Sequence, residues 1–142
     1  MEIRRLTIEN YDQIIRLWIK AKLPFEEKGR DCKTAMAVQT KSSPDFFLGA
    51  YEGSELVGVA IASNDGRKGW INRLAVDPDH RGLGVAKALI SESEKVLRKL
   101  DIKIFCVLVD DFNVASKALF EKCGYIERRD IIYFSKRDNA GA

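Results

Sequence analysis

Residues 70–87 have the sequence Trp-Ile-Asn-Arg-Leu-Ala-Val-Asp-Pro-Asp-His-Arg-Gly-Leu-Gly-Val-Ala-Lys, which is the most informative segment of the chain. Its first seven residues are rich in β-formers, so they predict a strand that ends near Val76. The Asp-Pro turn that follows leads into two glycines, and helical periodicity then continues to about Leu100. A strand, a glycine-rich turn and a long helix therefore follow one another directly.

The glycine-rich turn, residues 81–87, has the properties of an anion site. The first amides of a helix have no partner inside the helix, and together with the helix dipole they favour a negative charge by about 0.3–1 kcal/mol. Gly82 and Gly84 leave the main chain open to phosphate oxygens, and Arg81 and Lys87 add positive charge. The spacing matches neither a P-loop nor the dinucleotide fingerprint, in which Lys87 would be a glycine. We expect a pyrophosphate site here, and the alternative is that the glycines only shape the turn.

Toward the N-terminus, the sequence predicts two helices and three more strands. The expected elements are a strand over 2–8, a helix from Asn10 with capping-box spacing to Gln13, a helix from Asp31 to about Thr40, and strands over 46–51 and 56–63. Short polar turns with glycine separate the last two strands from each other and from the strand at 70–76. These turns predict an antiparallel meander.

Toward the C-terminus, an apolar strand over 102–109 follows the long helix, so a right-handed crossover makes it parallel to the strand at 70–76. A helix over 113–123 ends at Gly124, and two strands are expected over 125–129 and 131–135, followed by a frayed tail at 136–142. The order β-α-α-β-β-β-α-β-α-β-β predicts an α/β (α+β) fold. Its mixed central sheet has about seven strands and helices on both faces.

Composition limits the possible classes of function. The 142 residues predict a single domain over 1–142. The net charge of +3 is too balanced for a surface devoted to nucleic acid, and no apolar run approaches a membrane span. A single histidine and three cysteines without a Cys-x-x-Cys spacing argue against a metal site or a disulfide framework. The charged first five residues lack a secretion signal, so we expect a cytoplasmic protein, as a monomer or homodimer.

Two motifs resemble those of a known family. Leu74–Pro78 followed by Arg81–Ala86 is similar to the acyl-CoA-binding motif of the GNAT superfamily of N-acetyltransferases, whose pattern [QR]-x-x-G-x-[GA] is met by Arg81, Gly84 and Ala86. Asn113 to Tyr125 is similar to the family's N-x-x-A helix and its closing G-[FY] turn. The order of elements agrees with the family over nearly the whole chain.

The resemblance implies a cofactor site and a fold that opens for it. The strands at 70–76 and 102–109 would separate after Val76, and the pantetheine arm of acetyl-CoA would lie between them. The main chain of Leu74 and Val76 would pair with the arm, the amides of Leu83–Ala86 would hold the pyrophosphate, and Asn113 would either touch the arm or only cap its helix. The implied cofactor contacts are Leu74, Ala75, Val76, Arg81, Gly82, Leu83, Gly84, Val85, Ala86, Lys87, Asn113 and Phe120.

The usual acid and base of the family are missing. Phe120 occupies the place of the general-acid tyrosine, and Leu108 that of the glutamate base. Positioned attack of an amine on the thioester remains feasible, because orientation alone supplies about 7–11 kcal/mol and a thiol with a pKa near ~8.5 leaves as thiolate. The Leu74 amide would polarise the carbonyl.

Replacement groups are weaker candidates. Glu26, Glu27, Asp110 and Asp111 are candidate bases whose alternative role is that of solvated loop charges, and Tyr125 is a candidate acid whose alternative role is packing. The sequence thus predicts acetyl transfer from acetyl-CoA to a primary amine, such as a protein N-terminus, a lysine or a small-molecule amine. A CoA-binding sensor or interaction module without catalysis is the alternative.

Overall fold

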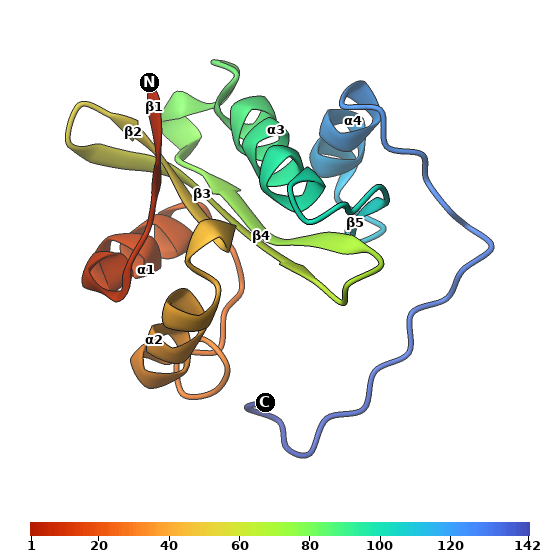
Figure 1. Cartoon of the computed structure of the whole chain (residues 1–142), viewed down its shortest axis with the longest axis horizontal. Coiled ribbons are helices and arrows are strands. Elements are labelled where there is room, and N and C mark those ends of the chain that lie inside the picture. The colour runs from red at the N-terminus through yellow and green to blue at the C-terminus, as the bar shows by residue number, and fades with distance from the viewer.

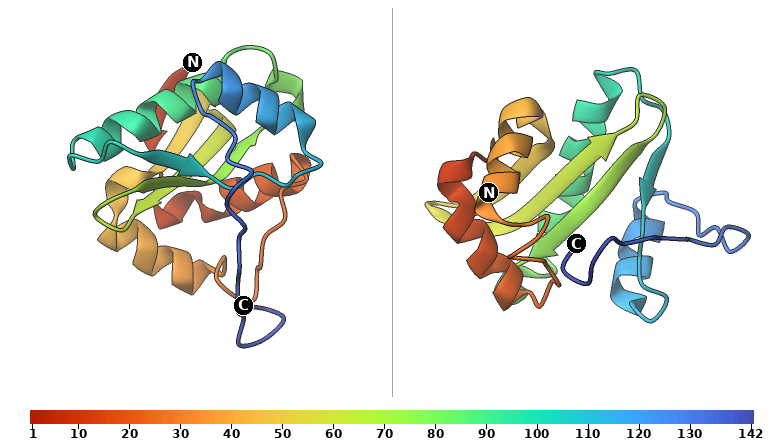
Figure 2. Two further views of the ribbon diagram at one scale, coloured as in Figure 1. Left: turned by 90° about the vertical axis from the view of Figure 1, so that its right-hand side faces the viewer. Right: turned by 90° about the horizontal axis from the view of Figure 1, so that it is seen from below.

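The computed structural model describes residues 1–142 as a five-stranded mixed sheet between two helical layers (Figure 1). The strands are β1 (Glu2–Arg5), β2 (Phe47–Glu52), β3 (Glu55–Asn64), β4 (Gly69–Val76) and β5 (Phe105–Val107), and the α-helices are α1 (Tyr11–Lys20), α2 (Lys33–Ser42), α3 (Val85–Arg98) and α4 (Val114–Lys122). Helices α1 and α2 cover one face of the sheet, and α3 and α4 lie on the other (Figure 2). None of these helices is both long enough and apolar enough to cross a membrane.

The sheet has the order β1-β2-β3-β4-β5, and its first four strands form an antiparallel meander. Strand β5 pairs in parallel with β4, as the strand–helix–strand pattern predicted. The predicted meander and the crossover through α3 are therefore confirmed, and the mixed α/β class with them.

Each face of the sheet carries its own core. On the α1 side, Trp18, Ile14 and Leu6 pack with Phe47 and Val59 of the sheet. On the α3 side, Val85 and Leu89 of α3 pack against β2 and β3. The strand residues of this core are Leu48, Ala50, Val57 and Ala60. Because β2 and β3 are covered on both faces, their residues form continuous apolar runs.

The helix predicted from Asn10 is confirmed, with Asn10 as the N-cap residue of α1, but the predicted side-chain caps of both N-terminal helices are wrong. The capping box lies one turn earlier than expected: Thr7 accepts from the Glu9 amide at 3.3 Å, and the Asn10 side chain accepts from the Thr7 amide at 2.9 Å. Helix α2 begins at Lys33 and is capped by the Cys32 thiol. Asp31 does not cap it, because an Arg73 side chain from β4 engages its carboxylate instead.

The prediction of seven strands is also wrong for this structure. Residues 125–129 and 131–135 form no strand, and the segment after Tyr125 leaves the body of the molecule (Figure 2). A strand needs a partner edge, and β5 has only three residues to offer instead of the eight expected over 102–109. The apolar side chains of the segment are consequently exposed: Ile126, Ile131, Ile132, Tyr133 and Phe134.

Candidate functional site

The turn that joins β4 to α3 presents main-chain donors to solvent. Gly82 and Gly84 have φ values of +79° and +81°, a region that L side chains rarely adopt, and no atom lies within 4 Å of where a Cβ would be. Gly84 is the N-cap of α3 without a side chain to cap it, and the first bond of the helix runs from the Ala88 amide to the Gly84 carbonyl at 3.0 Å. The amides just before Ala88 therefore remain free, as an anion site requires.

Cationic side chains border this turn. Arg81 and Lys87 are both exposed, whereas Val85 is buried against the sheet and Ala86 is half-buried. The turn is thus anchored through an apolar side chain, and its polar main chain and its charges face outward. An anion that approaches α3 along its axis meets both.

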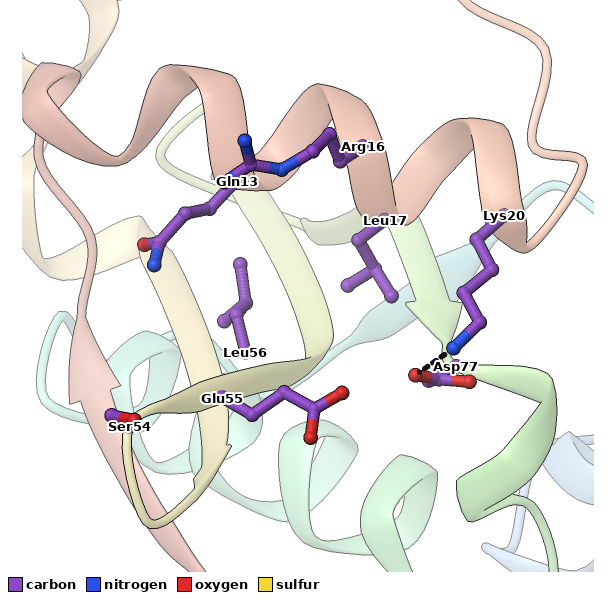
Figure 3. A pocket seen from close by; sticks show the side chains of 8 residues that line it. All are labelled: Gln13, Arg16, Leu17, Lys20, Ser54, Glu55, Leu56 and Asp77. Carbon is purple, nitrogen blue, oxygen red and sulfur yellow. Dashed lines mark hydrogen bonds and ion pairs between the residues drawn. The ribbon is translucent and has the colours of Figure 1, made fainter.

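Asp77 fixes the start of the turn. Its carboxylate is 3% exposed and accepts from the Asp79 amide at 2.9 Å and from Lys20 Nζ of α1 at 2.8 Å. The Lys20 hydrogen bond lowers the pKa of Asp77, so the group stays ionised. A polar hollow of about 320 Å³ lies beside this pair, between α1 and the β2–β3 turn (Figure 3). The hollow is on the α1 side of the sheet, away from the glycines.

The β4–β5 pairing ends at a different place from the one predicted, and we refer to the edge of β4 beyond it, residues 72–76, as the slot. The two strands pair only from Gly69–Phe105 to Ile71–Val107, so β4 loses this partner after Ile71 rather than after Val76. The Asp77 amide donates to the Val57 carbonyl at 2.8 Å. Because alternate residues of an antiparallel strand face opposite sides, the main chains of Leu74 and Val76 point away from β3 and into the slot, and that of Ala75 points toward β3.

Helix α4 packs beside the end of the β4–β5 pairing through Phe120. Phe120 is 5% exposed and packs with Ile71 and Ile90, so its ring lies at the closed end of the slot, beside the last β4–β5 pair. The Asn113 side chain accepts from the Ser116 amide at 3.1 Å. Of its two predicted roles, helix cap and contact with the pantetheine arm, the cap is therefore confirmed. Leu108, at the usual place of a base, is exposed.

Tyr125 is held by packing and by a hydrogen bond to α3. Its ring meets Phe120 edge-on with 5.2 Å between ring centroids, and its hydroxyl donates to Glu94 at 2.7 Å. Burial, followed by this hydrogen bond, raises the pKa of Tyr125 far above its usual value. The tyrosine therefore keeps its proton over the whole physiological range, and its oxygen is aimed at Glu94.

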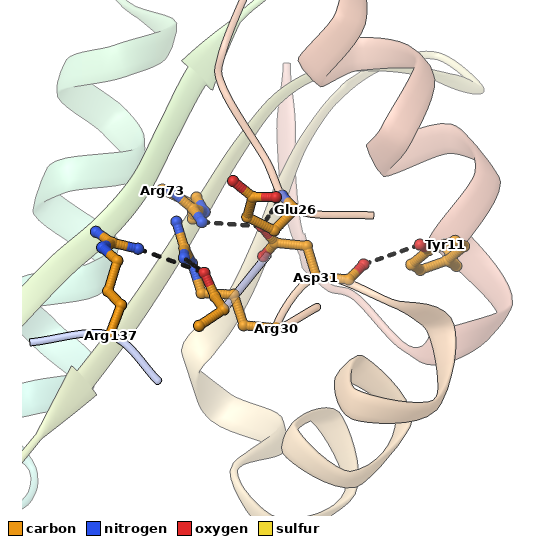
Figure 4. A network of polar contacts seen from close by, with 7 residues as sticks. Tyr11, Glu26, Arg30, Asp31, Arg73 and Arg137 are labelled. Carbon is orange, nitrogen blue, oxygen red and sulfur yellow. Dashed lines mark hydrogen bonds and ion pairs between the residues drawn. The ribbon is translucent and has the colours of Figure 1, made fainter. Parts of the chain in front are cut away.

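The α1–α2 loop, residues 21–32, brings charged groups to the other face of β4 (Figure 4). Glu26 is half-buried and Glu27 is exposed, and they are two of the four candidate bases. Sequence reasoning missed their neighbours Asp31 and Arg73, whose side chains pair at 2.9 Å between Oδ2 and Nη2. The available signal was Arg73 itself, the one charged residue of an otherwise uncharged strand.

Asp110 and Asp111 lie away from this loop, in the connection between β5 and α4. Asp111 is bound by Lys117 at 2.8 Å, which lowers its pKa, and Asp110 is exposed. No group of three or more His, Cys, Asp and Glu side chains has the proximity that a metal ion requires.

Comparisons with known proteins converge on one family. The model of the acetyltransferase (GNAT) family matches residues 11–125. Acetyltransferase ECA0875 of Pectobacterium atrosepticum is 34% identical and acetyltransferase SG1711 of Sodalis glossinidius 32% identical, each over 139 residues that cover 96% of this chain and 95% of the relative. The crystal structure of the PaiA N-acetyltransferase of Thermoplasma acidophilum in complex with coenzyme A has a TM-score of 0.75 and 25% identity, covering 86% of this chain and 87% of that one.

Proposed function

From the premise that this chain belongs to the GNAT acetyltransferase family and is an acyltransferase, we propose that it transfers the acetyl group of acetyl-CoA to a primary amine. The observation that carries the proposal is the position of the slot. It begins where β4 loses β5, and the free amides before α3 lie just past its open end. Acetyl-CoA, which carries a diphosphate toward one end and a thioester at the other, fits both features.

The cofactor side uses mainly main-chain groups. The amides of Leu83–Ala86 would hold the pyrophosphate, with Gly82 and Gly84 giving it access, while Arg81 and Lys87 supply charge. Leu74 and Val76 would pair with the pantetheine amides as an added strand does, with Ala75 between them. Phe120 would limit the depth that the thioester reaches, and Asn113 would approach the arm from α4.

Positioning carries most of the proposed chemistry. Acetyl-CoA supplies the acetyl group as a thioester. The Leu74 amide would donate to the carbonyl oxygen as negative charge develops there. The amine nitrogen forms the new C–N bond, the C–S bond breaks, and the sulfur leaves as a thiolate that needs no strong acid because the pKa of a thiol is near ~8.5. The proton lost by the nitrogen would pass to Glu26, directly or through water.

The acceptor side favours a cationic amine. The Glu26 carboxylate has no ion-pair partner in the chain, since Arg73 is already engaged by Asp31. Glu27 adds a second exposed negative charge. Both charges attract an acceptor that carries a positive group, such as a polyamine or a basic peptide.

A second candidate is a CoA-binding module without catalysis. It is favoured by Phe120 and Leu108, which replace the usual proton-transfer residues, and by Tyr125, whose hydroxyl is bound to Glu94. Under this hypothesis the cofactor side would be intact and the acceptor side would serve another purpose.

Two measurements test the proposal in sequence. Thermal unfolding with acetyl-CoA at 100 times its dissociation constant should show about 2.7 kcal/mol of added stability. Thiol release should then be followed with a panel of free amines that includes spermidine, lysine peptides and peptides with a free N-terminus. We expect the added stability and thiol release with at least one amine. Added stability without release would favour the binding module, and no added stability at millimolar acetyl-CoA would contradict both candidates.

A further inference from the structure

One ion pair in this chain is more shielded from solvent than any other, and its arginine lies in β4 next to the slot. The side chains of Arg73 and Asp31 are 19% and 9% exposed, whereas every other ion pair has at least one partner more exposed than either. The two residues are 42 positions apart and join the α1–α2 loop to β4. The Arg73 guanidinium also lies 5.8 Å from the centre of the Trp18 ring, so it is held by α1 as well.

A bulge in β4 directs Arg73 toward the loop. Ile61 pairs with Arg73 and Ala62 pairs with Ile71, so Asn72 has no partner in β3. The extra residue sends both Asn72 and Arg73 to the α1–α2 side: Asn72 borders a hollow with α2, and Arg73 reaches Asp31. Ile71 before the bulge and Leu74 after it both face the α3 side. The bulge falls where the slot opens, next to the Leu74 amide.

Asp31 fastens the loop through three of its atoms. Its Oδ2 accepts from the Glu26 amide at 2.8 Å as well as from Arg73, its amide donates to the Glu26 carbonyl at 3.0 Å, and its carbonyl accepts from the Tyr11 hydroxyl at 2.8 Å. The main chain of Glu26 is thereby bound at both its amide and its carbonyl. Its carboxylate is left free, and Figure 4 shows Glu26 beside Arg73.

Stability alone does not account for this arrangement. Taking two charges out of water is costly, and buried ion pairs are often replaced by apolar residues with no loss of stability or even a gain. An apolar pair at these two positions would still join the loop to the core around Trp18. What an apolar pair does not provide is an acceptor for the Glu26 amide.

We propose that Arg73 and Asp31 are positioning residues of the acceptor side, whose ion pair fixes the α1–α2 loop against β4 and holds the Glu26 carboxylate where the amine enters. The inference rests on the proposed function, because it assigns a task within amine transfer. Neither residue touches the reacting atoms. Both act by fixing the position of Glu26.

The loop itself is tested first, by hydrogen exchange of the full chain, which needs no acceptor. Asp31→Asn should speed exchange of the hydrogen-bonded loop amides at least tenfold and leave α3 and β1–β3 unchanged; these amides are those of Glu26, Gly29, Asp31 and Cys32. Arg73→Lys, tested as a single variant that keeps the positive charge, should retain most of the protection of the native loop. Unchanged exchange in Asp31→Asn would overturn the proposal, whatever the activity of the protein.

Kinetics then separate positioning from stability. With the amine that releases thiol fastest, Asp31→Asn and Arg73→Gln should raise the KM for the amine at least tenfold and change the KM for acetyl-CoA less than twofold. The pair Asp31→Leu with Arg73→Met should regain the thermal stability of the native chain without regaining the amine KM. Arg5→Gln, which breaks the exposed pair with Asp45, is the control and should change neither constant.

Two kinetic results would contradict the inference. One is a parallel loss of affinity for amine and acetyl-CoA, which indicates general damage to the fold. The other is recovery of the amine KM in the apolar double variant, which would mean that packing alone is required. If no amine releases thiol, the proposed function fails, and the exchange experiment still decides whether the pair holds the loop.

Discussion

The two faces of β4 expose different kinds of polar group. On the slot side the free groups belong to the main chain, from Leu74 to the turn before α3. On the α1–α2 side the polar groups are charged side chains: Arg73 and Asp31, which pair with each other, and Glu26, whose carboxylate is free. Main-chain donors suit a ligand that is the same in every member of a family, because they do not depend on side-chain identity. Side chains suit a ligand that differs, because single substitutions change them.

We predict that acetyl-CoA binding depends above all on whether the space beside the free amides is open. Gly84→Glu should lower acetyl-CoA affinity at least a hundredfold and abolish thermal stabilisation, because a carboxylate would take the place of the phosphates. Gly66→Glu is the matched control. Gly66 has a φ of +83°, close to the +81° of Gly84, and equally open surroundings in the β3–β4 turn.

Both variants should lose about 1–2 kcal/mol of stability from the strained backbone, but only Gly84→Glu should lose the ligand. Equal loss of acetyl-CoA binding in the two variants would contradict this prediction. It would mean that backbone strain, and not occupancy of the turn, controls binding.

A smaller effect is expected where a side chain supports the main-chain site. Asp77→Ala removes the hydrogen bonds to Lys20 and to the Asp79 amide, and should cost about 1–2 kcal/mol, since Lys20 is half exposed and solvent screens the pair. The folded-state pKa of Asp77 lies below its ordinary value of 3.8, so the pair stabilises the fold above that pH and loses its contribution as the pH falls further.

Denaturant unfolding from pH 7 down to pH 3 checks this sign. The native chain should be more stable than Asp77→Ala at pH 7, and the two curves should approach each other in acid. A difference that stays constant with pH would show that Asp77 acts through something other than its charge.

The smallest effect is expected at Tyr125, whose hydroxyl is directed at Glu94 of α3. Tyr125→Phe should cost about 1 kcal/mol of stability through the lost hydrogen bond to Glu94, and should change kcat less than threefold. A loss of kcat of a hundredfold or more would make Tyr125 the general acid and would place catalysis in a side chain on the slot side.

Sequence reasoning recovered the features that depend on local patterns. The meander follows from alternating apolar runs and glycine turns, and α3 follows from the helical period after Gly84, so both were predicted to within a few residues. The turn with free amides before α3 was predicted equally well, because it depends on Gly82 and Gly84, which lie within the turn itself.

Features that depend on distant partners were not recovered. Asp31 looks like a helix cap in sequence, and only the approach of Arg73, 42 residues later, gives it another role. The consecutive polar residues Asn72 and Arg73 interrupt the alternation of β4, but they do not reveal that β4 loses β5 after Ile71 rather than after Val76. Strand propensity over 125–135 was read without knowing that β5 has only three residues to pair with.

The most direct test of the account is the backbone amide spectrum of the chain during titration with coenzyme A. If main-chain donors bind the cofactor, the largest shift changes fall on the amides of Leu74, Val76 and Leu83–Ala86. Changes centred instead on the hollow between α1 and the β2–β3 turn, at Gln13, Lys20 and Ser54, with the amides before α3 unmoved, would contradict it.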